Sequence, residues 1–561
     1  MWRHNYEPIA GSLGLSALAA AIPIAVLFVM LGVLRKPAWM SALAALASAF
    51  VVALGVYGMP FQLAFMSTVY GAAYGMFPIA WIVFSSIMLY RLAVDTGKFE
   101  IIKDSVASLT DDRRLQALFI AFSFGAFIEG AAGFGAPVAV SGAMLAGLGF
   151  DPFFAAGICL LANTAPVAFG SIGIPIITLA NVTGLPVQAL SAMVGRLCAM
   201  MSVFIPGYLL FVMAGSTRAL EVLPAIIACG VSFASVQFFV SNFVGPELTD
   251  ILSSLTCIVV MVAVLKLWRP KSIMRFEGDQ AGKATAVTHS AGAVFAAWSP
   301  YLLLVVFVLA WGAPTIKNAI DAQTHSWLPS SVPKSQTVMN GLFVPGLHNL
   351  ITRVPPVTPT ESSYAAVFTF NWLTASGTAC FLATLAAAAF LRVKPSKIVD
   401  IYVATFRQLK FAIATIAAML GLAYLMNYSG MTSTLGLAFA ASGSAFPFFS
   451  AVVGWLGVFL TGSDTSTNAL FGNLQVVTAN ALKLNPVLTA SVNSSAGVMG
   501  KMISIQSIAV AVAATGMTAA DESRLFRFTI KHSVLLMAVI GLIALLYAYV
   551  VPGWVPVVPP K

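Results

Sequence analysis

Apolar stretches long enough to cross a lipid bilayer recur along almost the whole of this 561-residue chain. A transmembrane helix needs about 20 consecutive, mostly apolar residues. The first stretch, 12–34, exceeds the apolar core of about 7–15 residues in a signal peptide, so we predict an uncleaved first span. Charged residues make up only 9% of the chain, whereas a soluble domain has about 25%. We therefore predict an all-α, polytopic membrane protein with 12–14 transmembrane helices.

The net charge of +10 comes mostly from lysines and arginines in short loops between apolar runs. Cytoplasmic loops of membrane proteins collect basic residues in this way, so the charge predicts a lipid setting and no nucleic-acid partner. The five cysteines lie inside apolar runs without CxxC spacing. That placement favours buried small side chains over disulfides or a metal site. No HExxH or GxSxG motif occurs, which makes an intramembrane hydrolase the weaker interpretation.

Segments of the first half resemble segments about 332 residues later. The stretch "FIEGAAGFGAP" (127–137) aligns with "FLTGSDTSTNA" (459–469), and "NVTGLP" (181–186) aligns with "AATGMT" (513–518), both at an offset of 332. The stretch "LAVDTGKFEII" (92–102) aligns with one at an offset of 333. A nearly constant offset predicts an internal duplication.

Basic residues give the relative orientation of the two copies. Residues 91–114 carry five Lys/Arg and their counterpart 427–446 carries none, whereas 392–410 carries five and its counterpart 59–77 none. Equivalent loops therefore lie on opposite sides of the membrane, and the duplication is predicted to be inverted. Inverted repeats with Gly- or Pro-interrupted spans are typical of secondary transporters, with the binding site where the interrupted spans meet.

The predicted organisation has five parts. Three apolar runs are too long or too broken for one helix each, which predicts broken helices or re-entrant hairpins: 115–149, 445–482 and 486–516. The parts are 1–37 (first span and loop), 38–215 (first repeat), 216–363 (linking spans with a cytoplasmic loop 267–295 and an external loop 317–363), 364–552 (second, inverted repeat) and 553–561 (tail).

Two acids lie inside the interrupted runs, Glu129 in "FIEGAAGFGAPVA" (127–139) and Asp464 in "LTGSDTSTNALFGN" (460–473). An acid within a membrane span is a functional candidate by default, notably as a proton carrier. The alternatives are a structural, hydrogen-bonded Glu129 and an Asp464 that only caps a half-helix. Glu247 and Asp250 in "NFVGPELTD" instead favour a helix start after Pro246, with a role in transport as the alternative.

Two cations in apolar surroundings, Arg196 and Lys501, are candidates to hold an anionic substrate. The alternative for each is a basic side chain that snorkels to the interface. Half-helix amides and polar side chains near the breaks complete the predicted substrate site, although buried amides also join helices without binding anything. These residues are Gly130, Gly133, Gly135, Asn163, Thr164, Ser463, Thr465, Ser466, Asn468 and Asn493.

Several long motifs, including "GAFIEGAAGFGAPVAV" (125–140), "LANTAPVAFGSIGIP" (161–175) and "GWLGVFLTGSDTSTNALFG" (454–472), resemble the bacterial L-lactate permease family, which includes glycolate permeases. The resemblance implies uptake of L-lactate, D-lactate or glycolate, coupled to a proton, across the bacterial cytoplasmic (inner) membrane. It implies no cofactor other than the co-transported proton. A sodium-coupled carboxylate carrier and a passive carboxylate channel are the alternatives. The sequence leaves the oligomeric state open, a homo-oligomer included.

Overall fold

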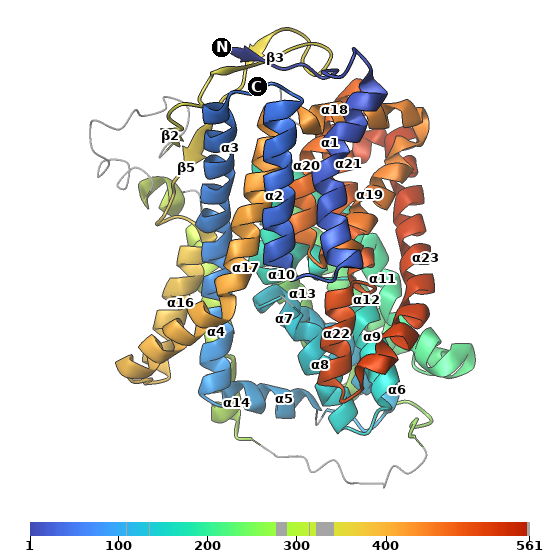
Figure 1. Cartoon of the computed structure of the whole chain (residues 1–561). Coiled ribbons are helices and arrows are strands. Elements are labelled where there is room, and N and C mark those ends of the chain that lie inside the picture. The colour runs from blue at the N-terminus through green and yellow to red at the C-terminus, as the bar shows by residue number, and fades with distance from the viewer. Residues whose placement is uncertain (108, 134, 277–288, 314, 321–340, 558–561) are drawn as a thin grey trace.

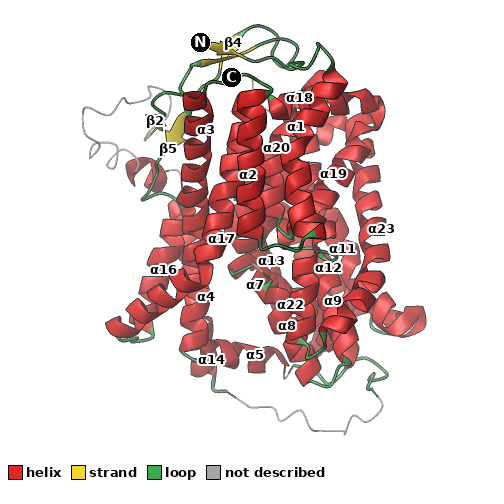
Figure 2. Cartoon of the chain, in the orientation of Figure 1, coloured by secondary structure: helices red, strands yellow, loops and turns green. Residues whose placement is uncertain are grey.

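The computed structural model describes residues 1–107, 109–133, 135–276, 289–313, 315–320 and 341–557. Parts of the two predicted loops (277–288 and 321–340) and of the predicted tail (558–561) lie outside the described residues. Within the described part, the chain is a bundle of helices (Figure 1, Figure 2). Among the described residues, twelve helices are long and apolar enough to cross a membrane, or thirteen if a pair bent by 63°, Pro152–Ala162 and Val167–Thr183, is one span. The prediction of 12–14 transmembrane helices is confirmed.

The helices fall into two series joined by a linking group. The first series is α1 (Leu13–Phe28) with η1 (Val29–Val33), α2 (Ala38–Gly55), α3 (Phe61–Tyr74) with η2 (Gly75–Ala80), α4 (Trp81–Asp95), α5 (Lys98–Ala107), α6 (Arg113–Ala117) with η3 (Leu118–Phe124), α7 (Gly125–Ala131), α8 (Ala136–Gly147), α9 (Pro152–Ala162), η4 (Val167–Phe169), α10 (Gly170–Thr183) and α11 (Val187–Leu220). The linking helices are α12 (Leu223–Phe243), α13 (Thr249–Leu267) and α14 (Ala291–Gly312). The second series is α16 (Ser376–Phe390), α17 (Pro395–Ser429), α18 (Met431–Phe439), η5 (Ala440–Ala445), α19 (Phe446–Thr461), α20 (Asp464–Ala481), α21 (Pro486–Lys501), α22 (Ile505–Ala514), η6 (Ala519–Asp521), α23 (Glu522–Tyr549) and η7 (Pro552–Trp554).

The two series are related by inversion, as predicted. The α7–α8 hairpin lies in the lower half of the molecule and the corresponding α19–α20 hairpin in the upper half (Figure 1). Likewise, α5 lies at the lower end and α18 at the upper end. Gly184 and Gly516, 332 positions apart, each follow a helix with a left-handed backbone, at φ of 69° and 75°. The division of the chain at 38–215 and 364–552 stays a prediction.

Short strands cover the end of the molecule that carries the N-terminus (Figure 2). In one sheet, β1 (Trp2–Arg3) runs parallel to β3 (Ile351–Arg353), which is antiparallel to β4 (Ser362–Ser363). In the other, β2 (Gly341–Phe343) is antiparallel to β5 (Val367–Thr369). Sequence periodicity did not predict these strands, because two or three residues are too few to show alternation. The strands β2, β3 and β4 lie within the predicted external loop 317–363, whereas β1 and β5 lie outside it. The strands are at the end of the molecule opposite the one that carries α5 (Figure 1).

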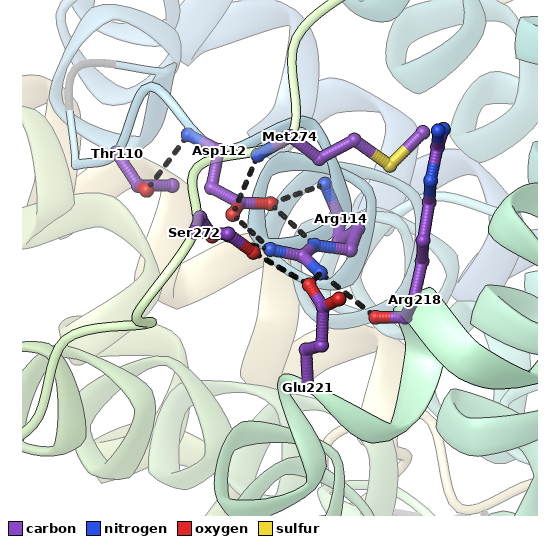
Figure 3. A network of polar contacts seen from close by, with 7 residues as sticks. All are labelled: Thr110, Asp112, Arg114, Arg218, Glu221, Ser272 and Met274. Carbon is purple, nitrogen blue, oxygen red and sulfur yellow. Dashed lines mark hydrogen bonds and ion pairs between the residues drawn. The ribbon is translucent and has the colours of Figure 1, made fainter.

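The root of the first hairpin is held by Arg114, whose side chain is fully buried (Figure 3). Its guanidinium donates to both carboxylate oxygens of Asp112 at 3.0 and 2.7 Å, and to Glu221 at 2.7 Å. It also donates to the carbonyl oxygens of Arg218 and Ser272. A buried charge is tolerated when it is paired and its donors are used. This network ties the start of α6 to the end of α11 and to the segment after α13.

We expect Glu221→Gln to lower the melting temperature at neutral pH and to have less effect in acid. Hydrogen bonds from Ser272 and Arg114 hold the pKa of Glu221 below its ordinary value. A lowered pKa stabilises the fold above the carboxyl's unfolded pKa, and that contribution is lost as the pH falls through the folded pKa. Thermal unfolding in detergent from pH 7 down to pH 2 should therefore show the two melting temperatures converging only below the ordinary carboxyl pKa of about 4.3. A constant difference would contradict the ionic role.

Candidate functional site

The tip of the first hairpin is a glycine turn packed against the start of α10. Gly133 and Gly135 have φ of 61° and 84°, a backbone that other residues rarely adopt. A Cβ atom on Gly133 would lie 2.1 Å from Oγ of Ser171. That hydroxyl donates to the carbonyl oxygen of Ala132 at 2.7 Å. The sequence predicted the break correctly, and close packing explains why glycine is needed there.

Glu129 lies on α7 one turn before this tip and is 2% exposed. Its Oε1 is 3.2 Å from Nζ of Lys501, which ends α21 in the second repeat. Its Oε2 is buried without a hydrogen-bond partner among the described residues. The ion pair therefore joins the two repeats through a single contact and leaves one carboxylate oxygen unused.

Gly170 gives the Glu129 carboxylate its room. A Cβ atom on Gly170 would lie 2.5 Å from Oε1 of Glu129. We expect Gly170→Ala to fold but to push the carboxylate away from Lys501, with substrate uptake falling about tenfold, since small displacements in a site carry large losses. Initial uptake rates in proteoliposomes would measure this. The control is Gly147→Ala, where the added methyl group meets nothing within 4 Å; equal losses in both variants would contradict the steric argument.

The tip of the second hairpin holds Asp464 at the start of α20. Ser463, rather than Asp464, is the N-cap, and its Oγ accepts from the amide of Ser466. Oδ2 of Asp464 accepts from Oγ of Ser494 at 2.6 Å and from Nδ2 of Asn468 at 3.2 Å. Its Oδ1 is buried and, within the described part of the chain, has no partner. The capping alternative for Asp464 is therefore wrong.

Two broken spans complete the site. In the first repeat, Ser171, Ile172 and Gly173 have φ of 46°, 60° and 72°, which interrupts the start of α10. In the second, α21 ends at Lys501 and α22 begins after the N-cap Ser504. The first amides of a helix lack partners within it and carry partial positive charge. The starts of α8, α10, α20 and α22 thus meet around one space, which suits an anion.

That space is a cavity of about 250 Å³ between the two hairpin tips and the two breaks. One water in the liquid takes up about 30 Å³, so a small organic acid with a few waters would fit. Of the predicted site residues, the cavity wall contains Glu129, Gly135, Ser463, Asp464, Thr465, Ser466 and Lys501. Lys501 is the one basic side chain among its described lining residues.

The other predicted residues lie around the cavity. Asn163 and Thr164 border a small space beside Lys501. Asn468 donates to Asp464, and Asn493 donates to Asn468 at 2.9 Å, so both belong to the support behind that acid. Gly130 packs on Asp250: a Cβ atom placed on Gly130 would lie 2.7 Å from Cβ of Asp250. These positions support the wall and do not line it.

Arg196 does not line the cavity, contrary to the prediction. Its guanidinium donates to Oδ1 of Asn242 at 3.0 Å and to the carbonyl oxygen of Trp554. Its side chain ties α11 to the end of α12 and to the chain after α23. Both Arg196 and Lys501 have apolar neighbours in the sequence. Only Lys501 is next to a helix break, and that break is the feature that indicates a position at the cavity.

Sequence reasoning missed several polar lining residues: Ser171, Thr415, Gln506 and Ser507. Ser507 was recognisable in principle, because Ser504 and the following apolar run predict a helix start that would bring Gln506 and Ser507 to the site. Thr415 lies in the continuous helix α17, and no local pattern distinguishes it.

Comparisons with known proteins show the family of the chain. Residues 16–551 match the family model described as L-lactate permease. The L-lactate permease of Bacillus subtilis (strain 168) is 49% identical over an alignment of 570 positions, which covers 99% of this chain and 100% of that protein. The chain belongs to the L-lactate permease family. The chain is also 44% identical to the L-lactate permease of Escherichia coli (strain K12) over an alignment of 563 positions, which covers 99% of this chain and 100% of that protein.

A glycolate permease, GlcA of Escherichia coli (strain K12), is 45% identical to this permease over 564 residues, 98% of this chain and 99% of that one. Among solved structures, Neisseria gonorrhoeae MtrF is 10% identical, with a TM-score of 0.45 over 87% of this chain and 85% of that chain. The family and the apolar helices make this a multi-pass bacterial membrane protein that acts in transport and is not an enzyme.

Proposed function

We propose that this permease takes up L-lactate, D-lactate or glycolate across the bacterial cytoplasmic membrane by proton symport with alternating access. Its relatives are named for lactate and glycolate. The observation that carries the coupling mechanism is the Lys501–Glu129 ion pair in the wall of the cavity, with the side chains 12% and 3% exposed.

The ion pair makes proton binding and substrate binding depend on each other. While Glu129 is ionised, it occupies the ammonium group of Lys501. A proton on Glu129 removes that partner and leaves the ammonium group to the substrate carboxylate. By linkage, the bound anion then favours the protonated carboxyl to the same extent.

The helix starts and hydroxyl groups around the cavity serve the rest of the substrate. The amides at the starts of α20 and α22 would share the carboxylate charge with Lys501. The 2-hydroxyl group would meet the side chains of Ser463, Thr465 or Ser507, which both donate and accept hydrogen bonds. A 2-hydroxymonocarboxylate uses both kinds of partner.

The inverted repeats support the proposal of alternating access. The site is built where the hairpin tip and the broken span of one repeat meet those of the other, and in such transporters one repeat moves against the other around a fixed site. The Glu129–Lys501 pair spans that boundary. Its breaking and re-forming therefore couples ligand binding to the contact between the moving parts.

The experiment is uptake of labelled lactate and glycolate into proteoliposomes. One proton carried with one anion moves no net charge, so the membrane potential, worth about 2.3 kcal/mol per charge per 100 mV, contributes nothing. An inward pH gradient should drive accumulation with Na⁺ replaced by choline and the potential clamped at zero. Dependence on Na⁺ would favour the sodium-coupled carrier, and equilibration without accumulation would favour the channel.

A further inference from the structure

Asp250 is a buried acid to which the transport mechanism above gives no role. It is the second residue of α13 and is 1% exposed. Both of its carboxylate oxygens are buried and have no hydrogen-bond partner among the described residues. Charged groups without donors are costly inside a protein, so this geometry favours a carboxyl that carries a proton.

The start of α13 is packed directly against the hairpin that carries Glu129. A Cβ atom placed on Gly130 would lie 2.7 Å from Cβ of Asp250 and 3.1 Å from the amide nitrogen of Ile251. Only a glycine beside Glu129 allows this approach. The side chain of Asp250 therefore packs on the residue that directly follows Glu129, the carboxyl that we propose as the proton site of the cavity.

Few titratable groups surround Asp250. Glu129 on α7 interacts electrostatically with the Asp250 carboxyl group. The thiol of Cys198 on α11 interacts electrostatically with both Asp250 and Asp464. Of the other elements packed against α13, η3 and α10 bring no acid or base in their described residues, and α12 brings only Cys229, which contacts Cys257 farther along α13. A proton on Asp250 thus has Glu129 as its acidic neighbour on the side of the cavity.

A second pocket lies at the turn that precedes α13, and Leu248, two residues before Asp250, is in its wall. It has a volume of about 370 Å³ and is lined by the turn before α13, the end of α14, the start of α11 and Ser376. Glu247, three residues before Asp250, lies in its wall with Lys317. Oε1 of Glu247 accepts from Oγ of Ser376 at 3.1 Å. The pocket wall contains the end of α14 and Lys317, the first residue of the predicted external loop 317–363, so we assign this pocket to the external side.

We propose that Asp250 is a second proton-binding carboxyl, which passes a proton between the outer pocket at Glu247 and Glu129 in the substrate cavity. This proposal rests on proton symport as the function. The proton leaves one carboxyl as it joins the next, so no other reactant is required. The route lies behind the first hairpin, apart from the substrate, and lets Glu129 gain its proton while the substrate fills the cavity.

The test compares Asp250→Asn with wild-type protein in two assays in proteoliposomes. The first is pH-gradient-driven lactate uptake. The second is counterflow, in which internal unlabelled lactate exchanges for labelled lactate at equal pH and no net proton movement is needed. We expect Asp250→Asn to lose at least tenfold in the first initial rate and to keep the second within twofold. Glu247→Gln should show the same pattern with a smaller loss.

The control is Asp151→Asn, at an exposed N-cap where Asn serves as well as Asp. If Asp250→Asn is not recovered as a folded protein, Asp250→Ser, uncharged and smaller, takes its place. Wild-type rates of pH-driven uptake in a folded variant would overturn the proposal. So would equal losses in both assays, which indicate a packing role. Wild-type protein without pH-driven uptake would overturn the proton symport itself.

Discussion

Lys501→Met is expected to reduce lactate transport at least 100-fold at every pH, in both gradient-driven uptake and counterflow. The ammonium group is the basic partner that the described cavity wall offers to a carboxylate. Removing one partner of a buried charge pair costs about 3–5 kcal/mol, and each 1.4 kcal/mol corresponds to about tenfold in affinity. Methionine keeps the length of the side chain and removes its charge. Binding of labelled lactate to the purified variant would locate the loss at the binding step.

Two further variants separate binding from folding. Lys501→Met leaves Glu129 without its partner, so the double variant Lys501→Met with Glu129→Gln should recover the melting temperature but not transport, because both charges are then gone. Lys397→Met removes an exposed lysine, 3.8 Å from Asp95, and should transport normally. Recovery of transport in the double variant would show that Lys501 only balances Glu129 and does not hold the substrate.

The sequence predicted the architecture well because lipid imposes strict rules on it. Apolar length predicts spans, basic loops indicate sides and a constant offset reveals repeats. The same rules located both hairpin tips, since glycine-rich turns and acids are rare inside membranes. Glu129, Asp464 and Lys501 were found in this way, and the structure places all three in the wall of one cavity.

Individual contacts could not be predicted in this way. Arg196 and Lys501 have similar apolar surroundings in the sequence, yet Arg196 bonds to Asn242 and the chain end near Trp554. Trp554 is 358 positions away from Arg196 in the sequence, and no local pattern encodes their contact. Asp250 was interpreted as part of a helix start, and it does begin α13. Its burial depends on the close approach of Gly130, which is a tertiary contact.

Glu129→Gln is expected to abolish accumulation driven by the pH gradient while leaving counterflow intact. Glutamine has nearly the shape of a protonated glutamic acid, but it cannot gain or lose a proton, and it leaves Lys501 to the substrate at all times. With wild-type protein, one pH unit should support about tenfold accumulation, since it corresponds to about 1.4 kcal/mol. With the variant, internal and external lactate should only become equal.

The pH dependence of lactate binding gives an independent measure of the same coupling. In wild-type protein, binding should weaken as the pH rises, because the ionised Glu129 competes for Lys501 at 3.2 Å. In Glu129→Gln, affinity should be high and nearly constant, because the competitor has gone. Glu100→Gln, which removes an exposed acid paired with Lys103, should retain the wild-type profile. If Glu129→Gln binds lactate with the wild-type pH profile, another acid carries the coupled proton. Asp464, whose Oδ1 has no partner in the described chain, is then the next residue to replace, because it is the other acid in the same cavity wall.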